Sequence, residues 1–265
     1  MKAIVFKELK ANRKGLSMWM FGMLFMVAIG AAEYGTVVEN SESIMSMMDA
    51  MPRIVKVIFG MDILPVYTPL GYYVCMYLWY SMVAFAHAIV LGATIISKEE
   101  RDRTAEFLYT MPYSRKTIIS GKIIAAVINV LCMTIFTFLC IILTLVSQMN
   151  GESILPEIFT TLIGTFFAQM LCLAIGLFFS SLFNYHRTAM SMAILFFALS
   201  FVLAIVIEFV GNIEFLNFLT PFRYFFAPYV VTNGISSVYL LLSLFFTGVF
   251  VFLTYKLFEK RDIHC

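Results

Sequence analysis

The chain has 265 residues, of which 62% are hydrophobic and 13% are charged, and its mean hydropathy is +0.92. Ordinary soluble domains contain roughly 45–50% apolar and about 25% charged residues, so this composition excludes a water-soluble globular protein and a disordered chain. The formal net charge is only +2, which gives no electrostatic case for binding nucleic acid.

Six apolar runs are long enough to cross a hydrocarbon core, which takes about 20 residues of α-helix. The runs are continuously apolar and do not alternate in polarity, so they predict helices rather than the strands of a barrel. We therefore predict an all-α integral membrane protein whose six transmembrane helices form a single domain over residues 1–265. The predicted spans are residues 15–33, 72–96, 123–147, 158–183, 188–207 and 236–255.

Lysine and arginine residues are distributed unevenly between the two sides of these spans. Of the 18 such residues, only Arg53, Lys56 and Arg223 fall on one side. Positive residues gather on the cytoplasmic side of membrane proteins, so we expect both termini in the cytoplasm. Residues 2–14 place Ile4 among basic residues, which predicts a short amphipathic helix on the cytoplasmic surface.

The segment between the first two spans predicts an amphipathic helix along the outer interface, interrupted or entered at Pro52. Its apolar face is rich in methionine, and basic and acidic residues occupy the other. Two interpretations remain open. In the first, the apolar face contacts a hydrophobic substrate, since methionine adapts to irregular partners. In the second, this face is buried against lipid or neighbouring helices.

The loop between the second and third spans combines a charged stem with a compact apolar tip. The stem covers residues 98–106, and the tip runs from Phe107 to Met111 and ends at Pro112. A short helix of this kind suits docking into a groove on a soluble partner. The alternative is a loop that packs on its own helix ends. Ser114 is placed to cap the helix that follows.

Three stretches of the sequence resemble the ABC-2-type permeases of ABC transporters. The stretch from Glu99 to Arg115, followed by Ser120-Gly121-Lys122, resembles the cytoplasmic loop of that family, although Arg103 stands where many members have glycine. Residues 7–14 resemble its N-terminal elbow helix. Residues 219–225 resemble its outer segment before the last helix.

The resemblance implies a small six-helix exporter permease whose cytoplasmic loop forms a coupling helix on a separate ATPase subunit. It also implies a second permease copy or a homologue in the same bacterial plasma membrane. ATP and Mg²⁺ would bind the partner ATPase, and this chain would hold no cofactor. The residues expected to couple to the ATPase are Glu99, Glu100, Arg103, Thr104, Glu106, Phe107, Leu108, Tyr109, Met111, Pro112, Ser114 and Arg115.

The segment before the last span, residues 208–237, is rich in aromatic residues, which suit a membrane interface. In the family, short outer helices at this place close the translocation path, and simple interfacial anchoring is the alternative. With the Met-rich face, the candidates for a substrate path or outer gate are Met47, Met48, Met51, Pro221, Phe222 and Tyr224.

No catalytic or metal-binding motif is present. Gly121-Lys122 is followed by Ile123 and lacks the glycine-rich context of a phosphate-binding loop, so we do not expect this chain to hydrolyse ATP. His87 is the one histidine inside a predicted span, and we expect a neutral, hydrogen-bonded packing role for it. Asn129 and Gln169 are expected to form hydrogen bonds across helices.

We therefore expect a permease subunit of an ATP-driven exporter. Spans without charged residues favour an amphipathic or hydrophobic cargo, such as a peptide antibiotic, a toxin-like peptide or a lipid. A membrane enzyme acting on lipid or peptide would need convergent titratable groups, and the spans offer almost none. A non-transporting scaffold or sensor subunit shares the topology and remains open as an alternative.

Overall fold

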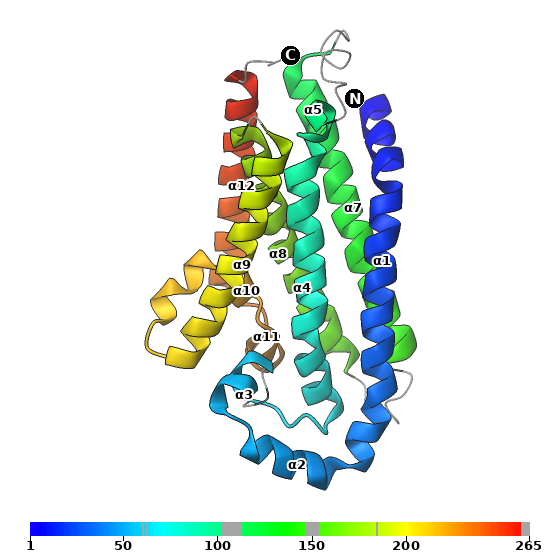
Figure 1. Cartoon of the computed structure of the whole chain (residues 1–265), viewed down its shortest axis with the longest axis vertical. Coiled ribbons are helices and arrows are strands. Elements are labelled where there is room, and N and C mark those ends of the chain that lie inside the picture. The colour runs from blue at the N-terminus through cyan, green and yellow to red at the C-terminus, as the bar shows by residue number, and fades with distance from the viewer. Residues whose placement is uncertain (60, 62, 102–112, 147–153, 184, 261–265) are drawn as a thin grey trace.

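The computed structural model describes residues 1–59, 61, 63–101, 113–146, 154–183 and 185–260, and every regular element in these ranges is a helix (Figure 1). The elements in chain order are α1 (Lys2–Glu39), α2 (Ser41–Ala50), α3 (Arg53–Phe59), α4 (Pro69–Ile95), α5 (Lys98–Arg101), α7 (Arg115–Thr144), α8 (Leu155–Leu182), α9 (His186–Val210), the 3-10 helix η2 (Glu214–Leu219), α10 (Pro221–Tyr224), α11 (Ala227–Asn233) and α12 (Ser237–Lys260).

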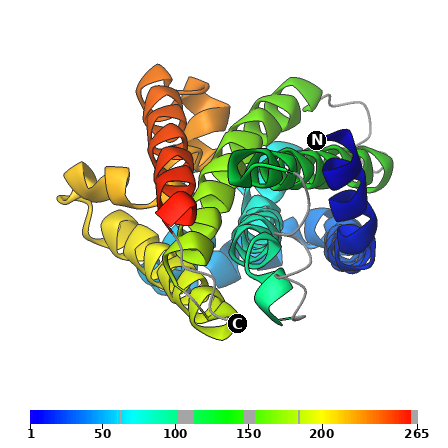
Figure 2. The ribbon, with the colours of Figure 1, turned by 90° about the horizontal axis from the view of Figure 1, so that it is seen from above.

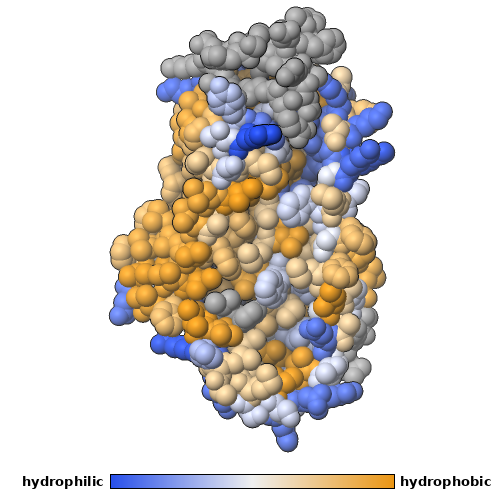
Figure 3. Space-filling model, in the orientation of Figure 1, coloured by the Kyte–Doolittle hydropathy of each residue, from blue (hydrophilic) through white to orange (hydrophobic). Residues whose placement is uncertain are grey.

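Six of these helices are long and apolar enough to cross a membrane: α1, α4, α7, α8, α9 and α12. Each contains or closely matches one predicted span, so the prediction of six spanning helices in an all-helical chain is confirmed. Apolar residues cover the middle of the face in Figure 3, and hydrophilic residues gather toward its two ends. This distribution suits a bilayer around the middle of the bundle.

The centre of the bundle is the packed pair of α4 and α8, with α1 and α9 on opposite sides of it (Figure 2). The pair crosses where Gly92 faces Gly176. A Cβ added at Gly92 would lie 2.3 Å from the carbonyl oxygen of Leu173, and one added at Gly176 would lie 2.3 Å from that of Ile89. The two backbones therefore approach more closely than any other residue type would allow, as small residues permit between membrane helices.

Hydroxyl groups reinforce this pair near the N-terminal ends of the two helices, several turns from the glycines. The Tyr73 and Thr161 hydroxyl groups are hydrogen-bonded at 2.6 Å, and those of Tyr77 and Thr165 at 2.8 Å. All four side chains are buried. Because buried polar groups must be satisfied internally, these bonds fix the register of α4 against α8.

The N-terminal region differs from the sequence expectation. Residues 2–14 do not form a separate short helix, because α1 continues without a break from Lys2 to Glu39. At 1.5 Å per residue its 38 residues span roughly 57 Å, nearly twice a hydrocarbon core of ~30 Å. No proline interrupts the run, and Gly15 by itself is too weak a breaker to end a helix.

The segment between α1 and α4 contains two helices rather than one. α2 ends at Ala50 and α3 begins at Arg53, so the predicted interruption at Pro52 is confirmed. These two helices lie at one end of the bundle, and the start of α1 and the end of α12 lie at the other (Figure 1). The assignment of the latter end to the cytoplasm stays a prediction from charge.

Candidate functional site

Most of the residues expected to couple to an ATPase lie outside the described residues. This applies to the whole apolar tip and to its neighbours Arg103, Thr104, Glu106 and Pro112, while Glu100 belongs to α5 without a described side chain. The structure describes the two ends of the loop, with Glu99 at its start and Ser114 and Arg115 at its end.

At the start of the loop, α5 contributes two charged residues to a buried ionic cluster. Glu99 pairs with Lys122 of α7, and Lys98 pairs with Glu8 of α1. Lys122 also lies 3.3 Å from Glu8, which joins the two pairs into one network. We call these four residues the Lys122 cluster. Glu99 is thus turned toward the helices.

Lys122 is the centre of this cluster. Its side chain is 1% exposed, and its ammonium group donates to the carbonyl oxygen of Ile95 at 2.7 Å as well as to Glu8 and Glu99. An ammonium group has three N–H donors, so all of them are used. Ile95 is the last residue of α4, where a positive charge also complements the negative end of the helix.

A close contact between α1 and α7 lies directly beside this cluster. A Cβ added at Gly121 would lie 2.8 Å from Cγ2 of Ile4, and Ile4 also packs with the fully buried Ile118. Ile4 and Glu8 are four residues apart and share one face of α1. The missing side chain at Gly121 therefore lets α1 approach α7 closely enough for Glu8 to reach Lys122.

The other end of the loop is tied to α7 and α12. Ser114 accepts a hydrogen bond from the backbone N–H of Thr117 at 3.2 Å, which confirms its prediction as the cap of α7. Arg115 donates to the carbonyl oxygen of Glu259 at 3.1 Å. One turn further, the hydroxyl groups of Ser120 and Tyr255 are hydrogen-bonded at 2.8 Å. The start of the loop thus contacts α1 and α7, and its end, at the first turn of α7, contacts α12.

At the opposite end of the bundle, the Met-rich face is only partly covered. Met48 packs against the hydrophobic core, and Met51 is half-buried. Met47 is 63% exposed. The chain by itself therefore leaves room for lipid or another apolar partner at Met47.

Within the outer aromatic segment α10 is buried in the bundle, whereas Phe215 and Phe218 are exposed. Pro221, Phe222 and Tyr224 are all buried, and the Phe222 ring contacts those of Phe85 and Phe201 at centroid distances of 5.2 and 5.3 Å. Burial, with a smaller contribution from Tyr239, raises the pKa of Tyr224 to about 12. Its phenol therefore keeps its proton at neutral pH and donates to the carbonyl oxygen of Phe218 at 2.6 Å.

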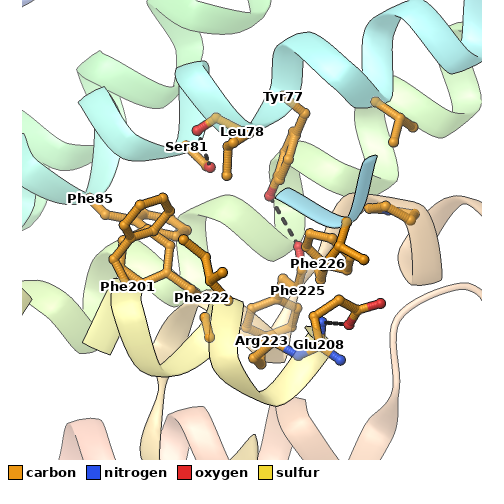
Figure 4. A pocket seen from close by; sticks show the side chains of 15 residues that line it. Tyr77, Leu78, Ser81, Phe85, Phe201, Glu208, Phe222, Arg223, Phe225 and Phe226 are labelled. Carbon is orange, nitrogen blue, oxygen red and sulfur yellow. Dashed lines mark hydrogen bonds and ion pairs between the residues drawn. The ribbon is translucent and has the colours of Figure 1, made fainter. Parts of the chain in front are cut away.

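A cavity with an empty volume of about 600 Å³, part of it open to solvent, lies between α3, α4, α9, α10 and α11. Phe85, Phe201 and Phe222 gather at one end of it, and the ion pair of Glu208 and Arg223 lies at another side (Figure 4). The cavity walls are therefore mainly aromatic and aliphatic, with one paired charge group at the edge.

The family model described as "ABC-2 family transporter protein" matches residues 2–263 of the chain. The chain belongs to the ABC-2 family. A search of curated proteins found no match. Family membership and six apolar helices make this protein a multi-pass membrane component of an ABC transporter, that is, a permease subunit.

Within the permease, Gln169 has the role that its sequence position predicts. It accepts from the Thr134 hydroxyl at 2.5 Å and donates to the carbonyl oxygen of Ala84 at 3.3 Å, which joins α7, α8 and α4. The same prediction is wrong for Asn129, which donates to the carbonyl oxygen of Ala125 one turn earlier on its own helix. His87 is buried and contacts the Trp19 ring of α1, in agreement with packing, but its Nδ1 atom has no hydrogen-bond partner among the described residues, so the expected hydrogen bond is absent there.

Sequence reasoning missed the three ion pairs of the Lys122 cluster and the pair of Arg223 with Glu208. Lys122 and Glu8 were assigned to a loop end and a surface helix, and Arg223 was placed in the outer aromatic segment without a partner. Arg223 pairs with Glu208 at the end of α9 and also lies over the rings of Phe226 and Tyr229. The available signal was the position of each charge next to an apolar run, where an unpaired charge is costly.

Proposed function

We propose that the protein is the permease subunit of an ATP-driven exporter powered by a separate cytoplasmic ABC ATPase. Membership of the ABC-2 family over nearly the whole chain carries this proposal. Members of this family typically work with an ABC ATPase and dimerise, so the complete transporter would contain a second copy or a homologue in the cell membrane. ATP and Mg²⁺ would bind the ATPase rather than this chain.

The proposed cargo is an amphipathic or hydrophobic molecule such as a peptide antibiotic, a toxin-like peptide or a lipid. In support, the fully buried residues of α4 and α8 carry hydroxyl and amide groups but no charge, and the one acidic residue of these two helices, Glu157, is half-buried in the first turn of α8. The outer cavity is walled mainly by aromatic and aliphatic residues. Such surfaces favour apolar groups over hydrophilic ions, because an ion would lose its hydration without compensation.

The proposed coupling site is the loop between α4 and α7. The loop begins and ends at the same end of the bundle as the start of α1 and the end of α12, and its apolar tip has the composition of a docking segment (Figure 1). ATP binding would move the ATPase subunits, and the tip would pass this motion to α4 and α7.

Replacing Phe107 in the apolar tip tests this function. Phe107→Asp places a charge where the contact with the ATPase would be apolar, so we expect loss of a co-purifying ATPase from the detergent-solubilised permease. Phe107→Leu is the matched control, because it keeps an apolar side chain and is expected to retain the partner. The measurement combines identification of partners by mass with ATPase activity and the amount of permease inserted in the membrane.

Each other outcome contradicts part of the proposal. Normal ATPase recruitment by Phe107→Asp would refute the coupling site. A wild-type permease that purifies stably without any ATPase would refute the exporter. The non-transporting scaffold or sensor subunit and the membrane enzyme acting on lipid or peptide would then be the remaining functions.

A further inference from the structure

Four charged side chains meet inside the bundle where the cytoplasmic loop begins. The Lys122 cluster contains two carboxylates and two ammonium groups, and Glu8, Glu99 and Lys122 are 2%, 6% and 1% exposed. These residues come from α1, α5 and α7, which are distant in sequence. Charges removed from water this completely need a specific arrangement of partners.

Every ion pair within the cluster involves Lys122, Glu8 or both. Lys122 donates to α1 through Glu8, to α5 through Glu99 and to the last carbonyl group of α4 at Ile95. Glu8 uses its second oxygen for Lys98 of α5. None of α1, α5 and α7 can move far without breaking a buried ion pair. Displacement of α4 would break the hydrogen bond at Ile95.

Stability alone does not require charges at this place. Apolar residues of similar volume are often as stabilising as a buried ion pair or more so, whereas removing one partner of such a pair is strongly destabilising. Ion pairs are directional, however, and they fix one geometry between the groups that they join. A cluster at the first turn of the loop is thus suited to transmit a displacement of that loop.

We propose that Glu8, Glu99 and Lys122, with Lys98, form a joint that makes α1, α5 and α7 move together when the cytoplasmic loop is displaced. This role rests on the proposed coupling to an ATPase. The four residues are positioning residues, since they act through the loop and do not contact cargo or nucleotide. The close contact of Gly121 with Ile4 keeps α1 and α7 together beside the joint.

Hydrogen–deuterium exchange of the full-length permease in lipid nanodiscs tests the joint without any ATPase. Lys122→Met is expected to speed exchange by at least about tenfold in both residues 2–14 and residues 95–101, because it leaves two buried carboxylates without their central partner. Residues 41–59 at the other end should be unchanged. Lys116→Met is the matched control on α7, since it removes only the exposed pair with Glu259 and should change neither segment.

A double variant separates transmission from stability. Lys122→Met with Glu99→Gln removes one charge of each sign and leaves the Glu8–Lys98 pair in place. We expect its thermal unfolding to return toward that of the wild type, while ATP turnover of the co-purified complex stays reduced at least about tenfold. A merely structural role would restore both.

Two results would overturn the joint. One is unchanged exchange of residues 2–14 in Lys122→Met, which would show that α1 is held independently. The other is wild-type ATP turnover in the double variant, which would show that charge at this place is not needed for coupling. Absence of any co-purifying ATPase from the wild type is a different failure. It would refute the proposed function and the transmitting role, and the exchange result would still decide whether α1 and α5 are held together.

Discussion

Gly92 and Gly176 show how a single residue type sets the distance between two helices. At each position the space for a Cβ is occupied by backbone atoms of the opposite helix, which cannot rotate aside as a side chain can. Not every glycine of the spanning helices is constrained in this way. Gly22 on α1, for example, has no atom within 4 Å of its missing Cβ.

This difference gives a prediction for paired substitutions. Gly92→Ala should destabilise the permease by about 1–3 kcal/mol, because the added methyl group forces α4 and α8 apart. Gly22→Ala should be neutral or stabilising by up to ~1 kcal/mol, since alanine is the better helix former. Thermal unfolding in detergent measures both, and equal effects of the two substitutions would contradict this account of the crossing.

At the scale of elements, α4 and α8 are held together by hydroxyl pairs as well as by the glycine contact. Tyr73 with Thr161 and Tyr77 with Thr165 repeat one turn apart along the two helices. Tyr77 also donates to the carbonyl oxygen of Phe225 at 3.2 Å, which attaches the outer segment to this pair. The pair of α4 and α8 therefore forms the centre of the bundle and also holds Phe225, which lines the cavity.

A double-mutant cycle measures one of these bonds. Tyr73→Phe and Thr161→Val each remove one hydroxyl group and little volume, and the coupling energy between them should be about 0.6 kcal/mol and at most ~1.7 kcal/mol, as for other interhelical hydrogen bonds in membranes. Ser46, whose hydroxyl bonds its own helix α2, provides the control site: Ser46→Ala combined with Tyr73→Phe should show no coupling. Additive effects of Tyr73→Phe and Thr161→Val would mean that the bond contributes nothing to the pair.

At the scale of the whole molecule, the bundle has two distinct ends. The start of α1, the end of α12 and α5 lie at one end, and α2 and α3 lie at the other (Figure 1). Most lysine and arginine residues belong to the first end. By the positive-inside rule we expect this end to face the cytoplasm.

Cysteine labelling in intact cells tests this orientation. In a variant without the five native cysteines, Ser43→Cys on α2 should react with a membrane-impermeant maleimide from outside. Lys10→Cys on α1 should react only after the membrane is permeabilised. Both positions are exposed in the protein, so any difference in their reaction with the maleimide reports on which side of the membrane they lie. The reverse pattern would invert the topology and place the loop outside, where no cytoplasmic ATPase could bind it.

Much of the fold was predictable because it depends on local composition. The lengths of the apolar runs decide how many helices cross the membrane. Pro52 marks a helix end because it has no backbone N–H, and Ser114 marks one because its side-chain hydroxyl accepts a hydrogen bond from a backbone N–H of the helix. The failed expectation at residues 2–14 has a local cause as well, since polarity changes there while helix propensity does not. A change of surface composition predicts where a helix leaves the membrane, but it does not break the helix.

The sequence by itself determined the class of the protein, its six membrane helices and its family resemblance, because apolar run length and short motifs are properties of neighbouring residues. Only the tertiary structure decided which charges are paired. Glu8 and Lys122 are separated by 114 positions, and their contact depends on how α1 packs on α7 at Gly121. Partner choice between distant charges follows from the packing of whole helices, which no local pattern specifies.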